Sequence, residues 1–224
     1  MTDIDKRIAR PAFFNSDMVR ALLDGRKTQT RRMVEPQPPH KGSMLASDAA
    51  APSGFSWVHD LHDDVLLTCP YGKPGDLLWV REAFRLDDYN NQSAIYRADM
   101  PDSVAEETKG IIKWKPSIHM PRWASRLTLK ITDVRVERVQ DISEEDALAE
   151  GIDRTDNNFG NGVAYCDYQM KRKNDTSDWF NSPVDSFQSL WDSINNNWND
   201  NPWVWVIQFE VIKQNVDEVM EAIK

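Results

Sequence analysis

The chain has few of the features that mark several common classes of protein. Its 224 residues include only two cysteines, Cys69 and Cys166, which are too far apart in the sequence to suggest a disulfide framework or a metal site. The longest unbroken apolar run is WVWVI at 203–207, far short of the about 18 residues of a membrane-spanning helix. Nine glycines and twelve prolines argue against a collagen-like or low-complexity chain. These features favour a globular domain without a membrane partner.

Targeting and cofactor motifs are also missing. The first residues, MTDIDKRIARPAFFNS, lack the apolar core of a secretory signal, so a cytoplasmic protein is expected. No GxGxxG, Walker A or GxSxG motif is present. The segment HDLHDD at 59–64 has metal-binding residue types but no matching second half elsewhere in the chain. The sequence therefore predicts no cofactor and no metal.

An excess of positive charge is missing as well. The formal net charge is −9, and it is distributed unevenly along the chain. Residues 1–140 carry 21 Lys and Arg against 19 Asp and Glu, whereas residues 141–224 carry 6 against 17. Affinity for nucleic acids comes largely from neutralised phosphates, so the whole chain is a poor general binder of polyanions. Any basic site must be local and lie in residues 1–140.

What is present favours one α+β domain over residues 1–224, with insertions at about 36–70, 86–125 and 153–181. Hydrophobic residues at 40% and charged residues at 28% are ordinary for a globular chain. Apolar periodicity and capping residues predict helices at 16–24, 143–150, 183–194 and 216–223. The same reasoning, with period-2 alternation, predicts strands at 28–34, 76–85, 93–97, 126–139 and 203–212, with a bulge or tight turn at 132–133.

The segment that most suggests a functional site is GRKTQTRR at 25–32, which places Lys27 and Thr30 among three arginines. Residues three apart face opposite sides of a continuous strand. Lys27 and Thr30 would therefore converge only if the chain bends between them. A functional site and a solvated, basic start of a strand both remain open.

Two further features, the segment at 113–126 and Glu82, each allow a functional and a structural interpretation. KWKPSIHMPRWASR at 113–126 interleaves cations with two tryptophans; such side chains stack on bases and hold phosphates, or the tryptophans pack on the domain. Glu82 shares a strand face with apolar residues, so it is expected to point inward. A buried carboxylate needs a partner, and a pair with a nearby arginine is the favoured interpretation.

Several motifs together resemble the ASCH-domain family of the PUA-like β-barrel superfamily. These are GRKTQTRR, CPYGKPGDLLWVREAF, WKPSIHMPRWASR, the helix VQDISEEDALAEGI and the strand PWVWVIQFEVI. The string is similar to ASCH proteins of tailed phages and prophages over nearly the full chain. The resemblance implies a PUA-like open β-barrel of five or six strands with flanking helices and long loop insertions.

The enzymatic branch of that family, the N4-acetylcytidine amidohydrolases, implies a catalytic trio of Lys27, Thr30 and Glu150. In this trio a base activates the threonine hydroxyl, and a carboxyl at a helix C-terminus gives a proton to the leaving amine. Burial and the neighbouring arginines would lower the pKa of Lys27 and Glu150 would raise it, and the sequence leaves the balance open. The candidate substrate-binding residues are Arg26, Arg31, Arg32, Glu82, Lys115, His119, Arg122 and Trp123.

The resemblance leaves two classes of function open. One is an amidohydrolase whose partner is a small nucleoside-like substrate. The other is a non-catalytic PUA-like module that binds single-stranded RNA or DNA. For the trio itself, the structural alternative is an exposed salt bridge between Lys27 and Glu150, with Thr30 an ordinary strand residue.

Overall fold

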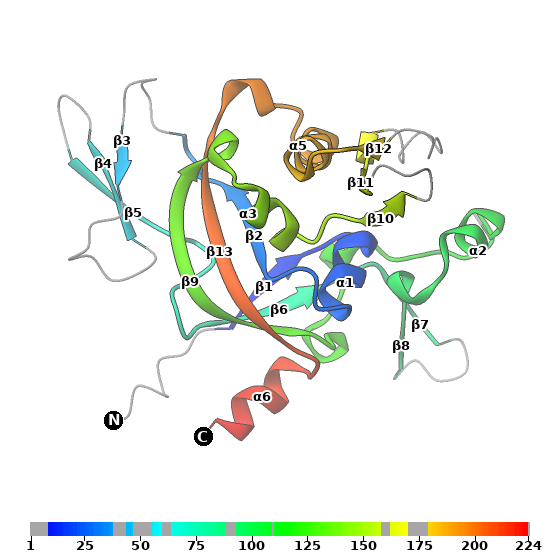
Figure 1. The fold of residues 1–224 in the computed structure, drawn as a ribbon. Helices are drawn as coiled ribbons and strands as arrows, with labels where there is room; N and C mark the ends of the chain where they lie inside the picture. The colour runs from blue at the N-terminus through cyan, green and yellow to red at the C-terminus, as the bar shows by residue number, and fades with distance from the viewer. Residues whose placement is uncertain are drawn as a thin grey trace. The chain divides into compact units, whose positions relative to one another are not determined.

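The computed structural model describes residues 9–37, 44–46, 55–59, 64–87, 93–108, 110–157, 162–169 and 179–223, which form a mixed α+β fold (Figure 1). The α+β class expected from the sequence is confirmed. The main sheet has the strand order β1-β6-β9-β13-β2 and is open, and the described residues contain no closed barrel. Its strands are β1 (Ala9–Phe13), β2 (Gln29–Met33), β6 (Leu77–Arg81), β9 (Thr128–Arg138) and β13 (Trp203–Ile212).

Pairing within this sheet is mostly antiparallel. β6 pairs antiparallel with β9, and β13 pairs antiparallel with β2, placing Ile207 opposite Thr30. β1, by contrast, runs parallel to β6. Among the described residues, none of the helices combines the length and the apolar character that crossing a membrane would require.

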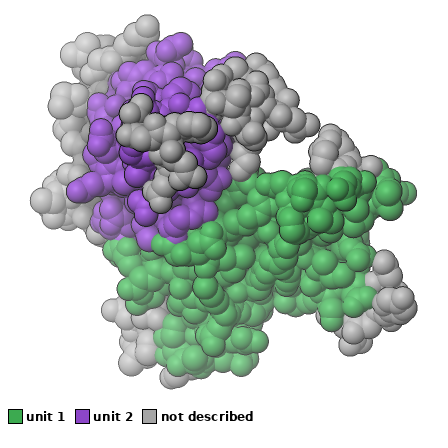
Figure 2. Space-filling view, turned by 45° about the vertical axis from the view of Figure 1, so that its right-hand side comes forward, with its two compact units in different colours: residues 1–25, 74–132, 209–224 green, residues 26–73, 133–208 purple. Residues whose placement is uncertain are grey.

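The chain divides into two compact units, coloured separately in Figure 2. Unit 1 comprises residues 1–25, 74–132 and 209–224, and unit 2 comprises residues 26–73 and 133–208. The long strands β9 and β13 each contribute residues to both units.

The described residues of unit 1 include two small apolar clusters. In one, Leu77 and Trp79 of β6 pack with Val216 and Val219 of the C-terminal helix. In the other, Phe84 packs with Met120 and Ala124. Besides its sheet strands, unit 1 contains α1 (Ser16–Leu23), β7 (Phe84–Leu86), β8 (Ala94–Tyr96), η2 (Arg97–Asp99), α2 (Asp102–Glu107), η3 (Ser117–His119), η4 (Arg122–Ala124) and α6 (Val216–Ala222).

Unit 2 contains two three-stranded antiparallel sheets, β3-β4-β5 and β10-β11-β12. Their strands are β3 (Met44–Ala46), β4 (Phe55–His59), β5 (Asp64–Thr68), β10 (Arg154–Asn157), β11 (Gly162–Cys166) and β12 (Trp179–Phe180). The helical segments of the unit are η5 (Val139–Asp141), α3 (Glu144–Ala149), α5 (Pro183–Ile194) and η6 (Trp198–Asp200).

All four predicted helices are present. α5 has the predicted bounds, and α1, α3 and α6 agree within one or two residues. α3 is capped by Ser143, whose hydroxyl accepts a hydrogen bond from the Asp146 backbone at 3.1 Å. α1 is capped by Asn15, whose side chain accepts from Met18 N at 2.8 Å. Gly151 follows α3 with a φ of 81°, which favours glycine.

The strand predictions need several corrections. The insertions at 36–70 and 153–181 contain β3–β5 and β10–β12, and the segment 76–85 forms two strands, β6 and β7. These strands are two to five residues long, too short for a periodic signal among polar neighbours. β1 and α2 were not predicted; β1 contains Pro11, which weakens a strand pattern and is tolerated at a sheet edge. Of the bulge or tight turn expected at 132–133, the tight turn is absent, because β9 continues through these residues.

The change of face expected within β9 is nonetheless visible in its burial. Leu129 and Ile131 are buried, and Val134, of the other parity, is the next buried position. The strand therefore exchanges its buried face without leaving the extended conformation.

Candidate functional site

The GRKTQTRR segment lies against the C-terminal end of α3. Lys27 forms a β-bridge with Glu150, and Thr28 N donates to the Ala149 carbonyl at 2.9 Å. The Gln29 side-chain amide donates to the Asp146 carbonyl at 2.9 Å. The last carbonyls of a helix lack partners within the helix. Thr28 N supplies one to Ala149, whereas the Asp146 carbonyl also accepts from Glu150 N at 2.9 Å. Lys27 is thus placed at the helix end that also carries Glu150.

Lys27 and Glu150 form a buried ion pair. The Lys27 ammonium lies 2.8 Å from Glu150 Oε2 and also donates to the Glu150 backbone carbonyl at 2.8 Å. The two residues are 1% and 3% exposed. The exposed salt bridge considered from the sequence is therefore not what the structure contains.

Burial determines the direction in which the pKa of Lys27 is shifted, which the sequence left open. Loss of hydration lowers the pKa of this amine below its ordinary value of 10.5. Glu150 opposes the shift by attraction and hydrogen bonding, while the charges of Arg32 and Arg31 add to it. The net direction is downward, so neutral Lys27, the form that acts as a base, is easier to reach than in an exposed lysine.

Arg31 joins this pair to a larger charge network. Its guanidinium is fully buried and reaches Glu150 Oε1 at 3.4 Å, Asp146 Oδ2 at 2.7 Å and Glu137 Oε2 at 3.0 Å. Arg135 also contacts Asp146 Oδ2, at 2.6 Å, and pairs with Glu137. Among the described residues, Arg31 Nε has no hydrogen-bond partner.

Sequence reasoning did not assign Glu137, Arg135 or the side chain of Asp146 to the site. Glu137 and Arg135 share one parity of β9, which a search for charged residues at alternate strand positions would have found.

Thr30 is not joined to the pair in this structure. It is 6% exposed, and among the described residues no hydrogen bond links its hydroxyl to Lys27 or Glu150. Gln29 and Arg31, on either side of it in β2, both reach residues of α3. Because successive strand residues face opposite sides, Thr30 points to the other face. The structure thus brings together two members of the predicted trio.

Arg26 and Arg32 flank the pair differently. Arg26 lies 3.1 Å from Asp153 Oδ1 and donates to the Gly151 carbonyl at 3.0 Å, so it ties down the chain that follows α3. Arg32 is half-buried, pairs with Trp205 across the sheet, and acts on Lys27 through its charge.

Glu82 belongs to unit 1 and is paired as favoured from the sequence. Its carboxylate is 1% exposed and accepts two hydrogen bonds from Arg126, at 2.9 and 3.0 Å. Burial raises the pKa of Glu82, and Arg126 opposes this shift. Arg126 also stacks over the Tyr96 ring at 3.9 Å and pairs with Asp99 at 2.8 Å. Glu82 and Arg126 therefore form an ion pair within unit 1.

The remaining candidates lie on the 113–126 segment of unit 1. Trp123 is 51% exposed, so it is not a core residue. Lys115 and His119 are exposed, and Arg122 is held by Asp217 at 2.8 Å. The segment therefore presents one tryptophan and several cations to solvent.

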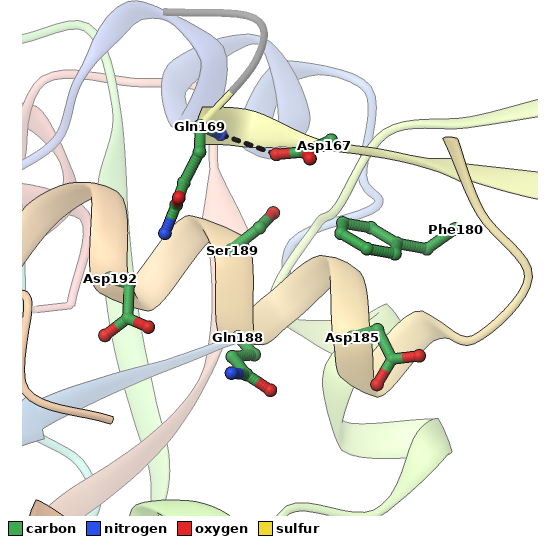
Figure 3. A pocket seen from close by; sticks show the side chains of 7 residues that line it. All are labelled: Asp167, Gln169, Phe180, Asp185, Gln188, Ser189 and Asp192. Carbon is green, nitrogen blue, oxygen red and sulfur yellow. Dashed lines mark hydrogen bonds between the residues drawn. The ribbon is translucent and has the colours of Figure 1, made fainter. Parts of the chain in front are cut away.

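Unit 2 also contains a cavity of about 250 Å³ beside α5 (Figure 3). The Gln169 backbone donates to Asp167 at 2.8 Å at its edge, and the Phe180 ring forms part of its wall. None of the predicted site residues lines it. The lining residues are Asp167, Gln169, Phe180, Asp185, Gln188, Ser189 and Asp192.

No family model, curated protein or solved structure matches the chain.

Proposed function

We propose that this protein is an ASCH-type amidohydrolase that removes the acyl group from an acylated nucleoside such as N4-acetylcytidine. The observation that carries the proposal is the buried Lys27–Glu150 pair, at 2.8 Å and with a lowered pKa for the amine. The resemblance of the sequence motifs to that family is its second support. A PUA-like barrel is the fold that this proposal assigns to the chain.

The proposed chemistry starts from the neutral Lys27 amine, which accepts the proton of the Thr30 hydroxyl. The Thr30 oxygen attacks the acyl carbon, the C–N bond breaks, and the proton taken up by Lys27 passes through the Glu150 carboxylate to the leaving amine. Water then hydrolyses the acyl ester on Thr30, which restores the hydroxyl and releases the acid.

This mechanism makes a geometric demand on the substrate complex. Thr30 Oγ1 must come within hydrogen-bond reach of Lys27 Nζ, about 2.6–3.2 Å or through one water. Hydrogen bonds of this kind are often looser in the free enzyme, and the opposite facing of Thr30 along β2 makes this contact the most demanding part of the proposal.

The charge of the chain favours a small uncharged substrate. With a net charge of −9, long polyanions are repelled on average. An acylated nucleoside carries no phosphate and escapes this repulsion.

Turnover of N4-acetylcytidine to cytidine, followed by liquid chromatography, tests the proposal. Lys27→Met, Glu150→Gln and Thr30→Ala should each lower kcat by about 10²-fold or more, whereas Thr30→Ser keeps a hydroxyl and should retain more activity. Lys130→Met is the matched control, since Lys130 is an exposed strand lysine 3.5 Å from Glu210. Absence of turnover by the wild-type protein would refute the proposal for this substrate.

A second candidate function rests on the exposure of Trp123. We propose as the alternative that the 113–126 segment binds single-stranded nucleic acid, with Trp123 as the stacking residue. Fluorescence anisotropy with oligonucleotides should then show salt-sensitive binding that Trp123→Ala weakens by about 1–3 kcal/mol. Trp179→Ala is the control, because Trp179 is 40% exposed but belongs to β12. Equal binding by both variants would argue against a role for Trp123.

A further inference from the structure

We infer that Arg31 is a positioning residue that holds Glu150 for Lys27 and favours the neutral form of the Lys27 amine. The inference rests on the proposed function and changes the role of Arg31 from substrate binding to control of the base.

The two carboxylate oxygens of Glu150 are divided between two cations. Oε2 lies 2.8 Å from Lys27 Nζ, and Oε1 lies 3.4 Å from Arg31 Nη1. A carboxylate held at both oxygens has its orientation fixed. Arg31 therefore sets the direction in which Glu150 presents Oε2 to the lysine.

Arg31 is itself firmly anchored and has no access to solvent. Its Nη2 lies 2.7 Å from Asp146 Oδ2 and 3.0 Å from Glu137 Oε2, and its side chain is 0% exposed. The guanidinium carbon stands 5.8 Å from the centre of the Phe187 ring. Because the Arg31 guanidinium is enclosed in this way, it can influence the reaction only through the residues that it contacts.

The charges that face the pair come from three elements. Arg31 and Arg32 are on β2 and both disfavour a proton on Lys27. The other charged groups of the network are Asp146 and Glu150 at α3, and Glu137 and Arg135 on β9. Arg31 is the only cation besides Lys27 that contacts Glu150 among the described residues. Its removal would leave the whole Glu150 charge to attract a proton to Lys27.

A titration without substrate tests this directly. In protein labelled at the lysine Cε carbons, the Lys27 NMR signal is assigned by its loss in Lys27→Met and followed against pH. Arg31→Met should move the titration midpoint of Lys27 upward. Arg31→Lys should move it in the same direction but less, because an ammonium keeps the charge but cannot span Glu150 and Asp146 as a guanidinium does.

Arg135→Met is the matched control. Arg135 contacts Asp146 and Glu137 in the same network, but it is not among the charges that shift the pKa of Lys27, so the midpoint should move far less than in Arg31→Met. Thermal melts of each variant confirm that the fold is retained. An unchanged midpoint in Arg31→Met, or in Arg31→Lys if Arg31→Met does not fold, would overturn the inference.

A pH profile of turnover extends the test to catalysis. In Arg31→Met the acid limb of kcat should move to higher pH, lowering kcat at pH 7 by about 10-fold or more while KM stays near the wild-type value and activity returns at alkaline pH. Lack of wild-type turnover would refute the proposed function and leave the titration as the test of Arg31. Wild-type turnover with an unmoved acid limb in Arg31→Met would refute the positioning role alone.

Discussion

Breaking the Lys27–Glu150 pair one side at a time should destabilise the protein. Removal of one partner from a buried ion pair typically costs about 3–5 kcal/mol, because the other charge is left uncompensated. In Lys27→Met, Glu150 keeps Arg31 at 3.4 Å, which places the expected cost near about 3 kcal/mol. At about 2–4 °C per kcal/mol for a chain of this length, the melting temperature should fall by about 6–12 °C.

The double variant Lys27→Met/Glu150→Leu shows whether the cost comes from the unpaired charge. Replacement of a buried pair by apolar side chains is often neutral or stabilising, so the double variant should lose less than the sum of the two single variants. Urea unfolding followed by circular dichroism measures all three free energies of unfolding. A double-mutant cycle then gives the coupling energy between the two positions.

The control for this series is an exposed pair of the same chemistry. Lys130 and Glu210 are 3.5 Å apart, with side chains 41% and 64% exposed, so Lys130→Met should change the free energy of unfolding by about 0–1 kcal/mol. If Lys27→Met proved no more destabilising than Lys130→Met, the burial argument for the pair would be refuted.

Three further outcomes are expected. The pKa of Lys27 is lower in the folded chain than its ordinary 10.5, so the unfolded chain binds more protons between the two values. The unfolding free energy of the wild type, measured relative to Lys27→Met, should therefore rise with pH between the two values. A difference that does not change with pH would contradict this expectation. Because burial raises the pKa of Glu82 above 4.5, the folded chain holds the extra proton there, so wild-type stability should fall relative to Glu82→Gln as urea-unfolding curves are taken from pH 4.5 upward. Trp123→Ala should shift stability by no more than about 0.5 kcal/mol in a thermal melt, as for other surface substitutions, whereas a loss of about 3–5 kcal/mol would place the ring in a core.

Long segments with a strong apolar pattern could be predicted from the sequence. α5 and β13 have the predicted bounds. Each has an apolar pattern over ten or more residues, and the spacing of that pattern fits a helix in α5 and a strand in β13. β4 and β11, five residues each, lie between polar stretches and pair only with other short strands. Their formation depends on partners that local periodicity does not reveal.

The candidate site was predictable to a different degree in each of its parts. Strand parity places Lys27 and Thr30 on opposite faces unless the chain bends between them, whereas the predicted trio requires them to meet. Among the described residues, the structure gives their side chains no mutual hydrogen bond. The contact of Lys27 with Glu150 spans 123 positions and followed from the family resemblance. Strand parity could have found Glu137 as a charged residue of β9, but its pairing with Arg31 could not be predicted, because it depends on tertiary contacts far apart in the sequence.

The Lys27–Glu150 pair is better explained by chemistry than by stability. Capping the last carbonyls of α3 requires donors but no buried ion pair, as the Thr28 backbone shows by donating to the Ala149 carbonyl at 2.9 Å. A buried ion pair adds a desolvation penalty that its own attraction often fails to offset. The segment nevertheless places an amine and a carboxylate in contact, away from water and beside a third buried charge, Arg31. Such an arrangement adds little to stability, whereas the lowered pKa of the Lys27 amine suits proton transfer.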